Sequence, residues 1–286
     1  MLDLEEILAT TCSIGWGAAD LLRSYCKTGS NQNLNVHYKY NEPVTAADLA
    51  VNHYILKRLQ AELNNLNFGY ISEETYKRGN REKLTSEFVW IIDPIDGTRD
   101  FIKKTGEYAI QIALVRKKRP ILAVVVIPEL QKLYYAVKGN GTFVKTPDGK
   151  SQPIKVSTRK SLEEVTLVFS RSHRNPKLEY LLQNLPCKNH KSLGSVGFKV
   201  ATIVEQGADI YISPCGKSAP KDWDMAAPEL ILTEAGGKFT HFSGDEFQYN
   251  TGYIDQWGGL LASNGQLHEL LSRKVEAILE TYQDLE

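Results

Sequence analysis

The chain has 286 residues, of which 42% are hydrophobic and 24% are charged, and 34 Lys and Arg balance 34 Asp and Glu for a formal net charge of +0. This is an ordinary globular composition, and the charge balance argues against a strongly basic protein that binds a nucleic-acid polymer. Because no apolar run approaches the ~20 residues needed to cross a membrane, and the first residues are acidic where a secretory signal is basic, we expect a cytoplasmic protein without a membrane partner.

The first half of the sequence predicts two helices followed by a sheet. Apolar residues at helical spacing predict helices over 4–26 and 45–63, with a polar loop over 28–42 between them. Thr45-Ala-Ala-Asp48 has the form of a capping box at the start of the second helix. The strands are expected at 66–72, 88–92, 107–116, 120–127 and 131–137, with a charged loop at 75–87. We expect the last three strands to form an antiparallel meander with helices packed on it.

The second half of the sequence shows a different pattern of predicted secondary structure. Residues 146–153, Thr-Pro-Asp-Gly-Lys-Ser-Gln-Pro, indicate a turn-rich junction. Beyond it, strands and helices alternate, with strands at 165–169, 208–212 and 259–262 and helices at 176–184, 195–206, 223–235 and 266–283. We therefore expect residues 1–150 to form an α+β half with an antiparallel sheet and the main metal site. Residues 151–286 should form an α/β half that supplies Asp224 and substrate contacts.

The spacing of the four cysteines gives no sign of a metal site or a redox pair. Cys12, Cys26, Cys187 and Cys215 show neither metal-binding nor redox spacing. They are predicted to be free thiols in a reducing compartment.

Residues 90–101, Trp-Ile-Ile-Asp-Pro-Ile-Asp-Gly-Thr-Arg-Asp-Phe, carry the strongest chemical signal. The proline between Asp93 and Asp96 should end the apolar strand, because it fixes φ and has no N–H. The two carboxylates and the Ile95 carbonyl can then converge as the oxygen ligands that suit Mg²⁺. Gly97 lets the backbone approach an anion, so the amides that follow could hold a phosphate oxygen if a helix begins there. A simple Asp-Gly-Thr turn is the alternative.

This sequence resembles the inositol monophosphatase superfamily of Mg²⁺-dependent, lithium-sensitive phosphatases. Residues 90–101 are similar to its first signature and Trp223-Asp224-Met225-Ala226 to its second. Ile71-Ser-Glu73-Glu74 resembles its upstream acidic element, and Pro43–Asp48 the start of its second helix. These elements occur in the family's order over residues 43–237. The resemblance implies an α+β and α/β fold, a layered αβαβα sandwich of the sugar-phosphatase type, and a phosphoric monoester hydrolase.

The resemblance also implies a metal site. Its ligands would be Glu73, Asp93, the Ile95 carbonyl, Asp96 and Asp224, which would hold two or three Mg²⁺ ions, with Li⁺ as an inhibitor. Two such cations can activate a water and stabilise the leaving oxygen of an in-line displacement. Two assignments stay open, since Glu74 is an alternative to Glu73, and Asp224 could instead cap the helix that begins there.

The implied catalytic residues are Thr98, Asp48 and Glu73. In the family, the threonine hydroxyl bonds to the aspartate and helps to activate the water. Asp48 also fits the third helical position of a capping box, and both roles can hold together.

Three segments resemble the 3′(2′),5′-bisphosphate nucleotidase branch of the family: residues 97–108, Ser170-Arg-Ser-His173, and Gly194-Ser195 with Lys199. They imply that the substrate is adenosine 3′,5′-bisphosphate or its sulfated form, with a role in sulfur assimilation. The implied substrate contacts are Asp96, Gly97, Thr98, His173, Ser195, Lys199 and Asp224. The chain has one residue more than the branch before Lys199, so the place of this side chain stays open.

Alternative functions also follow from the resemblance. One is a broader phosphatase that acts on inositol monophosphate or fructose 1,6-bisphosphate. Another is a non-catalytic relative that senses metal or nucleotide, which the intact ligand set argues against. Both a monomer and a homodimer are compatible with the sequence.

Overall fold

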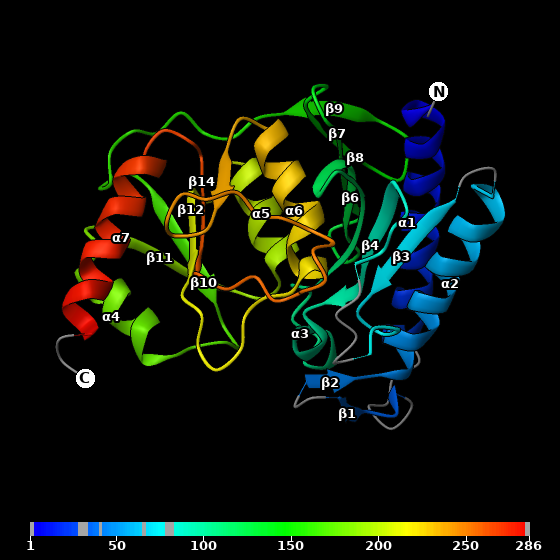
Figure 1. The fold of residues 1–286 in the computed structure, drawn as a ribbon, viewed down its shortest axis with the longest axis horizontal. Coiled ribbons are helices and arrows are strands. Elements are labelled where there is room, and N and C mark those ends of the chain that lie inside the picture. The colour runs from blue at the N-terminus through cyan, green and yellow to red at the C-terminus, as the bar shows by residue number, and fades with distance from the viewer. Residues whose placement is uncertain (1–2, 28–33, 40–41, 65–66, 78–82, 284–286) are drawn as a thin grey trace.

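The computed structural model describes residues 3–27, 34–39, 42–64, 67–77 and 83–283. Within them the chain forms five layers in the order α–β–α–β–α (Figure 1). The three helical layers are the pair α1 (Leu4–Lys27) and α2 (Ala46–Glu62), the pair α5 (Val196–Val204) and α6 (Asp222–Glu234), and the pair α4 (Pro176–Asn184) and α7 (His268–Gln283). The predicted layered sandwich is therefore confirmed. No helix among the described residues is both long enough and apolar enough to span a membrane.

The first sheet has seven strands in sequence order, from β3 to β9. Its strands are β3 (Phe68–Ser72), β4 (Phe88–Asp96), β5 (Ala109–Arg116), β6 (Arg119–Ile127), β7 (Lys132–Val137), β8 (Thr142–Lys145) and β9 (Ser151–Ile154). β3 and β4 are parallel, and every later pair is antiparallel, as the predicted meander required. The sequence analysis missed β8, and β9 occupies part of the predicted junction at 146–153. The division after residue 150 stays a prediction.

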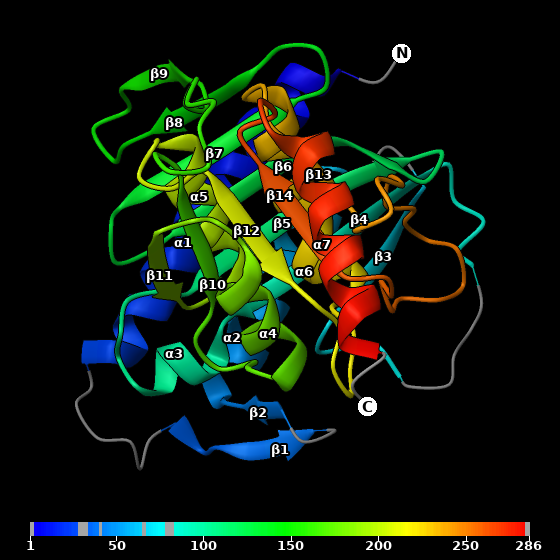
Figure 2. The same cartoon turned by 90° about the vertical axis from the view of Figure 1, so that its left-hand side faces the viewer.

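The second sheet has five strands in the order β11-β10-β12-β14-β13. Its strands are β10 (Thr166–Ser170), β11 (Asn189–Leu193), β12 (Ile210–Ser213), β13 (Lys238–Thr240) and β14 (Leu260–Ser263). Figure 2 shows α4 and α7 in front of this sheet, on the face turned away from α5 and α6. Sequence analysis missed β11 because its residues, Asn-His-Lys-Ser-Leu, are largely exposed and show no apolar alternation.

Part of the predicted loop 28–42 is instead a hairpin. β1 (His37–Lys39) pairs antiparallel with β2 (Glu42–Val44), while residues 28–33 and 40–41 lie outside the described residues. Lys39 Nζ donates to the Glu73 carbonyl at 2.7 Å, and the Glu42 carboxylate lies 3.2 Å from Arg99 Nη2. These contacts with distant parts of the chain hold strands that are too short and polar for their sequence to predict.

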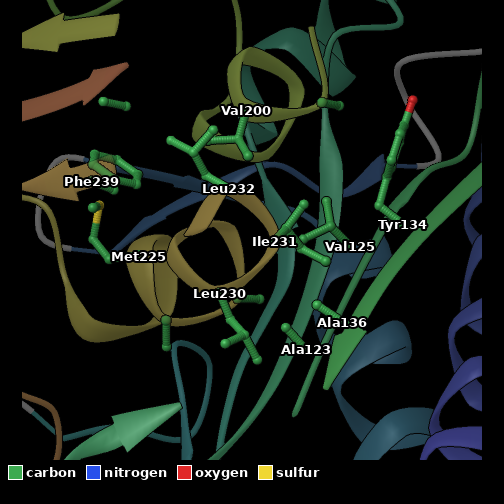
Figure 3. Close-up of a cluster of buried hydrophobic side chains, with 14 of the residues drawn as sticks. Ala123, Val125, Tyr134, Ala136, Val200, Met225, Leu230, Ile231, Leu232 and Phe239 are labelled. Atoms are coloured by element: carbon green, nitrogen blue, oxygen red, sulfur yellow. The ribbon is translucent and has the colours of Figure 1, made fainter. Parts of the chain in front are cut away.

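The middle helical layer joins the two sheets through one core. The apolar face of β5–β7, with Ala123 and Val125, packs against Leu230 and Ile231 of α6, and the other side of α6 meets Phe239 of β13 (Figure 3). A helix that is apolar on nearly all sides belongs between two sheets. α6 therefore places its first turn, with Asp224, between the two sheets.

Candidate active site

Three carboxylates from two elements, β4 and α6, lie close together. Asp93, Asp96 and Asp224 each offer an oxygen, and these oxygens lie within 4.8 Å of one another. Asp93 and Asp96 are buried, with 1% and 8% exposure, and Asp224 is partly exposed at the start of α6. Like charges that are buried this closely need a cation or protons to neutralise them.

A β-bulge explains how Asp93 and Asp96 come to face the same way. Asp93 pairs with Gln111 on β5, and Asp96 pairs with Ala109, so two residues of β4 oppose one residue of β5. In a regular strand, residues three apart point to opposite faces, and the extra residue restores them to one face. The prediction that Pro94 ends the strand is thus wrong. β4 runs on to Asp96, because a bulge accommodates a residue that cannot donate to the ladder.

Each of the three aspartates has one oxygen fixed by a backbone amide. Ile95 N donates to Asp93 Oδ1 at 3.0 Å, Gly197 N to Asp96 Oδ2 at 2.7 Å, and Lys221 N to Asp224 Oδ2 at 2.6 Å. Asp224 therefore does cap α6, as one interpretation held, and still lies in the carboxylate cluster. The second oxygen of each carboxylate is left to face its neighbours.

The structure separates Glu73 from Glu74. Both follow β3, which is parallel to β4, so their backbone reaches the same edge of the sheet as Asp93. Glu73 hydrogen-bonds with Asp93 and interacts with Asp224, whereas the Glu74 carboxylate lies 3.9 Å from Lys39 Nζ. Glu73 is thus the glutamate that faces the cluster, and Glu74 faces the hairpin.

The electrostatics of the cluster favour a cation. Burial, and after it the Asp224 carboxylate, raises the pKa of Glu73 well above its usual range. Burial and Glu73 do the same to the pKa of Asp93, and burial and Asp224 raise the pKa of Asp96 to about 7. Oxygen-only donors are the set that Mg²⁺ prefers, so the residues present fit a hard divalent cation. Which of them bind it stays a prediction.

Thr98 and Asp48 meet as the sequence implied. Thr98 Oγ1 lies 3.1 Å from Asp48 Oδ1 and 3.2 Å from the Ile95 carbonyl oxygen. Asp48 Oδ2 accepts from Thr45 N at 2.7 Å, which completes the predicted capping box of α2. The carboxylate of Asp48 therefore caps a helix with one oxygen and orients the threonine hydroxyl with the other.

The predicted anion-binding turn lies directly beside these residues. Gly97 has a φ of 93°, which glycine adopts readily, and it precedes the short helix α3 (Thr98–Ile102). A Cβ at Gly97 would lie 3.1 Å from Ser195 Cβ, so the start of α5 closes one side of this turn.

Other predicted substrate residues are placed differently. Ser195 Oγ accepts from Phe198 N at 3.0 Å and caps α5. Lys199 is buried at 1% exposure, and its ammonium donates to the carbonyl oxygens of Gly194 and Ser195. A contact between Lys199 and a phosphate stays a prediction. His173 is 58% exposed, and its Nε2 lies 3.7 Å from Glu42 Oε1 at the rim of the site.

Sequence analysis missed two features of the site. Gln111 donates from its amide to Asp96 Oδ2. Arg171 donates to Asp100 Oδ1 and to Glu107 Oε2, each at 2.6 Å, and Gly194 N donates to Glu107 Oε2 at 2.7 Å. A polar Gln within the apolar run of β5 was the available signal for the first. No sequence signal pointed to the contacts of Arg171, because the residues that make them are far apart in sequence.

Comparisons with known proteins identify the family of this chain. The family model described as the inositol monophosphatase family matches residues 3–280. The chain is 31% identical to the 3′(2′),5′-bisphosphate nucleotidase CysQ of Haemophilus influenzae, over 73% of this chain and 76% of that protein. It is 34% identical to the protein of the same name from Buchnera aphidicola, over 77% of this chain and 80% of that protein.

Solved structures share the fold. The inositol monophosphatase from Anabaena superposes with a TM-score of 0.74 at 24% identity and covers 96% of this chain and 97% of its own. CysQ from Bacteroides thetaiotaomicron superposes with a TM-score of 0.73 at 24% identity, over 91% of this chain and 97% of its own.

Proposed function

Because the chain belongs to the inositol monophosphatase family and is a metal-dependent phosphoric monoester hydrolase, we propose that it removes the 3′-phosphate of adenosine 3′,5′-bisphosphate with Mg²⁺ as its metal. The observation that supports the chemistry most directly is the convergence of Asp93, Asp96 and Asp224 beside the Gly97 turn. The name of the curated relatives, CysQ nucleotidase, supports the choice of substrate.

The proposed ligands are Glu73, Asp93, the Ile95 carbonyl, Asp96 and Asp224. When bound, Mg²⁺ would supply a Lewis acid and a water of lowered pKa. Amides hold one oxygen of Asp93, Asp96 and Asp224, which restricts the orientation of all three carboxylates.

The protein's own groups would position the nucleophile and the ester. Asp48 accepts the hydrogen of Thr98 Oγ1, which leaves the lone pairs of the threonine oxygen to orient a water. The backbone N–H groups at Gly97 and Thr98 would hold oxygens of the phosphate to be cleaved. Glu73, which faces the same cluster, completes the proposed catalytic set.

The remaining substrate contacts belong to the same proposal. His173 would contact the adenosine half, and Ser195 and Lys199 would contact the second phosphate, which is not cleaved. We also propose inhibition by Li⁺, a role in sulfur assimilation and a cytoplasmic location, in keeping with four thiols that are all free.

A substrate panel tests the assignment. We expect phosphate release from adenosine 3′,5′-bisphosphate to require Mg²⁺, to fall with added Li⁺, and to exceed release from inositol monophosphate and fructose 1,6-bisphosphate in kcat/KM. Asp93→Asn should abolish Mg²⁺-dependent phosphate release, because it removes a charged ligand of the metal. A higher kcat/KM for the inositol or fructose ester would replace the substrate, whereas near wild-type turnover by Asp93→Asn would refute the metal site.

A further inference from the structure

Gln111 is a buried polar residue in the middle of an apolar strand. It lies on β5, between Ile110 and Ile112, and has 0% exposure. It is the direct cross-strand partner of Asp93 on β4, so the two side chains leave the sheet on the same face. That face is covered by α5 and α6.

Among the residues that the structure describes, the amide of Gln111 has one hydrogen-bond partner, a carboxylate of the cluster. Its Nε2 donates to Asp96 Oδ2, and Gly197 N donates to the same oxygen at 2.7 Å. Its Oε1 is buried and has no hydrogen-bond partner among the described residues. A flipped amide would turn an oxygen toward the carboxylate, so the bond to Asp96 fixes the orientation and leaves Oε1 unpaired at a free-energy cost.

The hydrogen bonds that these described residues make to Asp96 end on one of its two oxygens. Two N–H groups donate to Oδ2, one from the sheet and one from the first turn of α5. The carboxylate can then rotate little, and Oδ1 is the oxygen left for a ligand. Asp93 and Asp224 each have a backbone donor from their own neighbourhood, whereas Asp96 depends on these distant groups.

We infer that Gln111 is a positioning residue for the metal ligand Asp96, acting together with the Gly197 amide. The inference rests on the proposed function in one respect, that Asp96 binds Mg²⁺. Groups that orient a metal ligand are worth about 10–100-fold in metal affinity. Gln111 is suited to this role because its amide is neutral. It can donate a hydrogen bond to Asp96 without adding a charge to the cluster and without neutralising the negative charge of the carboxylate.

Gly197 can bring its backbone N–H close to Asp96 because it has no side chain. A Cβ at this position would lie 2.7 Å from Ala109 Cβ, so a larger residue would push α5 away from β5. The same turn of α5 carries Ser195, beside Gly97. Displacing it should therefore weaken both the hold on Asp96 and the walls of the phosphate-binding turn.

The test measures Mg²⁺ binding to the full chain by isothermal titration calorimetry without substrate. We expect Gln111→Leu to weaken Mg²⁺ binding about 10–100-fold while the metal-free protein keeps its circular dichroism spectrum. Excess Mg²⁺ should restore most of kcat, which it would not do for a collapsed core. The matched control is Gln152→Leu on β9, where the side chain is exposed, and it should bind Mg²⁺ like the wild type.

Two further variants keep the test decisive. Gln111→Asn retains an amide that is one methylene too short to reach Asp96, and it should reproduce the weak binding if Gln111→Leu does not fold. Gly197→Ala should weaken Mg²⁺ binding and also raise KM. Equal Mg²⁺ affinity in the wild type and in every folded Gln111 variant would overturn this inference alone. A wild type that binds no Mg²⁺ would overturn the proposed function as well.

Discussion

Single carboxylates in this protein perform two tasks at once. Asp48 and Asp224 both occupy the third position of a helix and cap it with one oxygen, while the other oxygen faces Thr98 or the carboxylate cluster. A cap places a side chain in one defined rotamer at a helix N-terminus, where negative charge is favoured. The structural and the proposed catalytic roles therefore support each other.

His268 gives a prediction at the same scale, outside the site. It is buried at the start of α7, with Nδ1 2.8 Å from Ser263 Oγ and Nε2 2.9 Å from Thr240 Oγ1. Burial lowers the pKa of His268 from 6.5 to about 4. Because the folded pKa lies below the unfolded one, this contribution to stability is complete above about pH 6.5 and is lost as the pH falls toward 4.

We expect the wild type to lose about 2 kcal/mol of unfolding free energy between pH 7.5 and pH 4.8 that His268→Gln does not lose. Urea unfolding at the two pH values measures the difference. His53→Gln, on an exposed position of α2, serves as the control and should follow the wild type. An equal pH dependence in the wild type and His268→Gln would show that this histidine is not held neutral.

At the scale of elements, local irregularities form the site. The bulge in β4 brings Asp93 and Asp96 to one face, and the β1–β2 hairpin separates Glu74 from Glu73. Neither element is one that hydrophobic periodicity can reveal, since a bulge breaks the period of two and the hairpin strands are three residues each.

Arg171 links elements that are distant in sequence. It follows β10 and bonds to Asp100 of α3 and to Glu107, whose side chain also accepts from Gly194 N. The Asp100 side chain is only 4% exposed, so it would lose its charge partner in a buried place if the arginine were removed.

Arg171→Met should therefore cost about 2 kcal/mol of stability, less than for a fully buried pair because the arginine is 33% exposed. It should also raise KM, since Gly194 precedes the turn that faces Gly97. Arg174→Met is the matched control. Its pair with Glu179 is exposed on both sides and should contribute less than about 1 kcal/mol. Chemical denaturation and steady-state kinetics on both variants measure these effects. An equally small loss of stability in Arg171→Met and Arg174→Met would contradict the prediction.

At the scale of the whole molecule, the middle helical layer couples the unfolding of the two sheets. α6 packs on the seven-stranded sheet with one side and on the five-stranded sheet with the other, and the residues of this core come from both halves of the sequence (Figure 3). Neither sheet could lose α6 without exposing a large apolar face.

The metal-free protein should therefore unfold in a single calorimetric transition, with calorimetric and van't Hoff enthalpies nearly equal, although its length would allow two. Ile231→Ala in α6 should lower that transition as a unit, by about 2–5 kcal/mol. Leu49→Ala, at an exposed position of α2, should leave it nearly unchanged. Two separated transitions in the wild type would show instead that the halves fold independently.

The sequence by itself determined what depends on neighbours along the chain. The helices, the capping box at Thr45, the run of carboxylates around Pro94 and the layered fold followed from periodicity, from local hydrogen bonding and from a resemblance spread along the chain. Tertiary structure alone decided which glutamate faces the cluster, that Lys199 turns to backbone carbonyls, and that Gln111 holds Asp96. The Gln111 contact depends on the register between β4 and β5, and the amide that joins it at Asp96 comes from Gly197, 101 residues along the chain. No hydrophobic pattern along the chain encodes such a pairing.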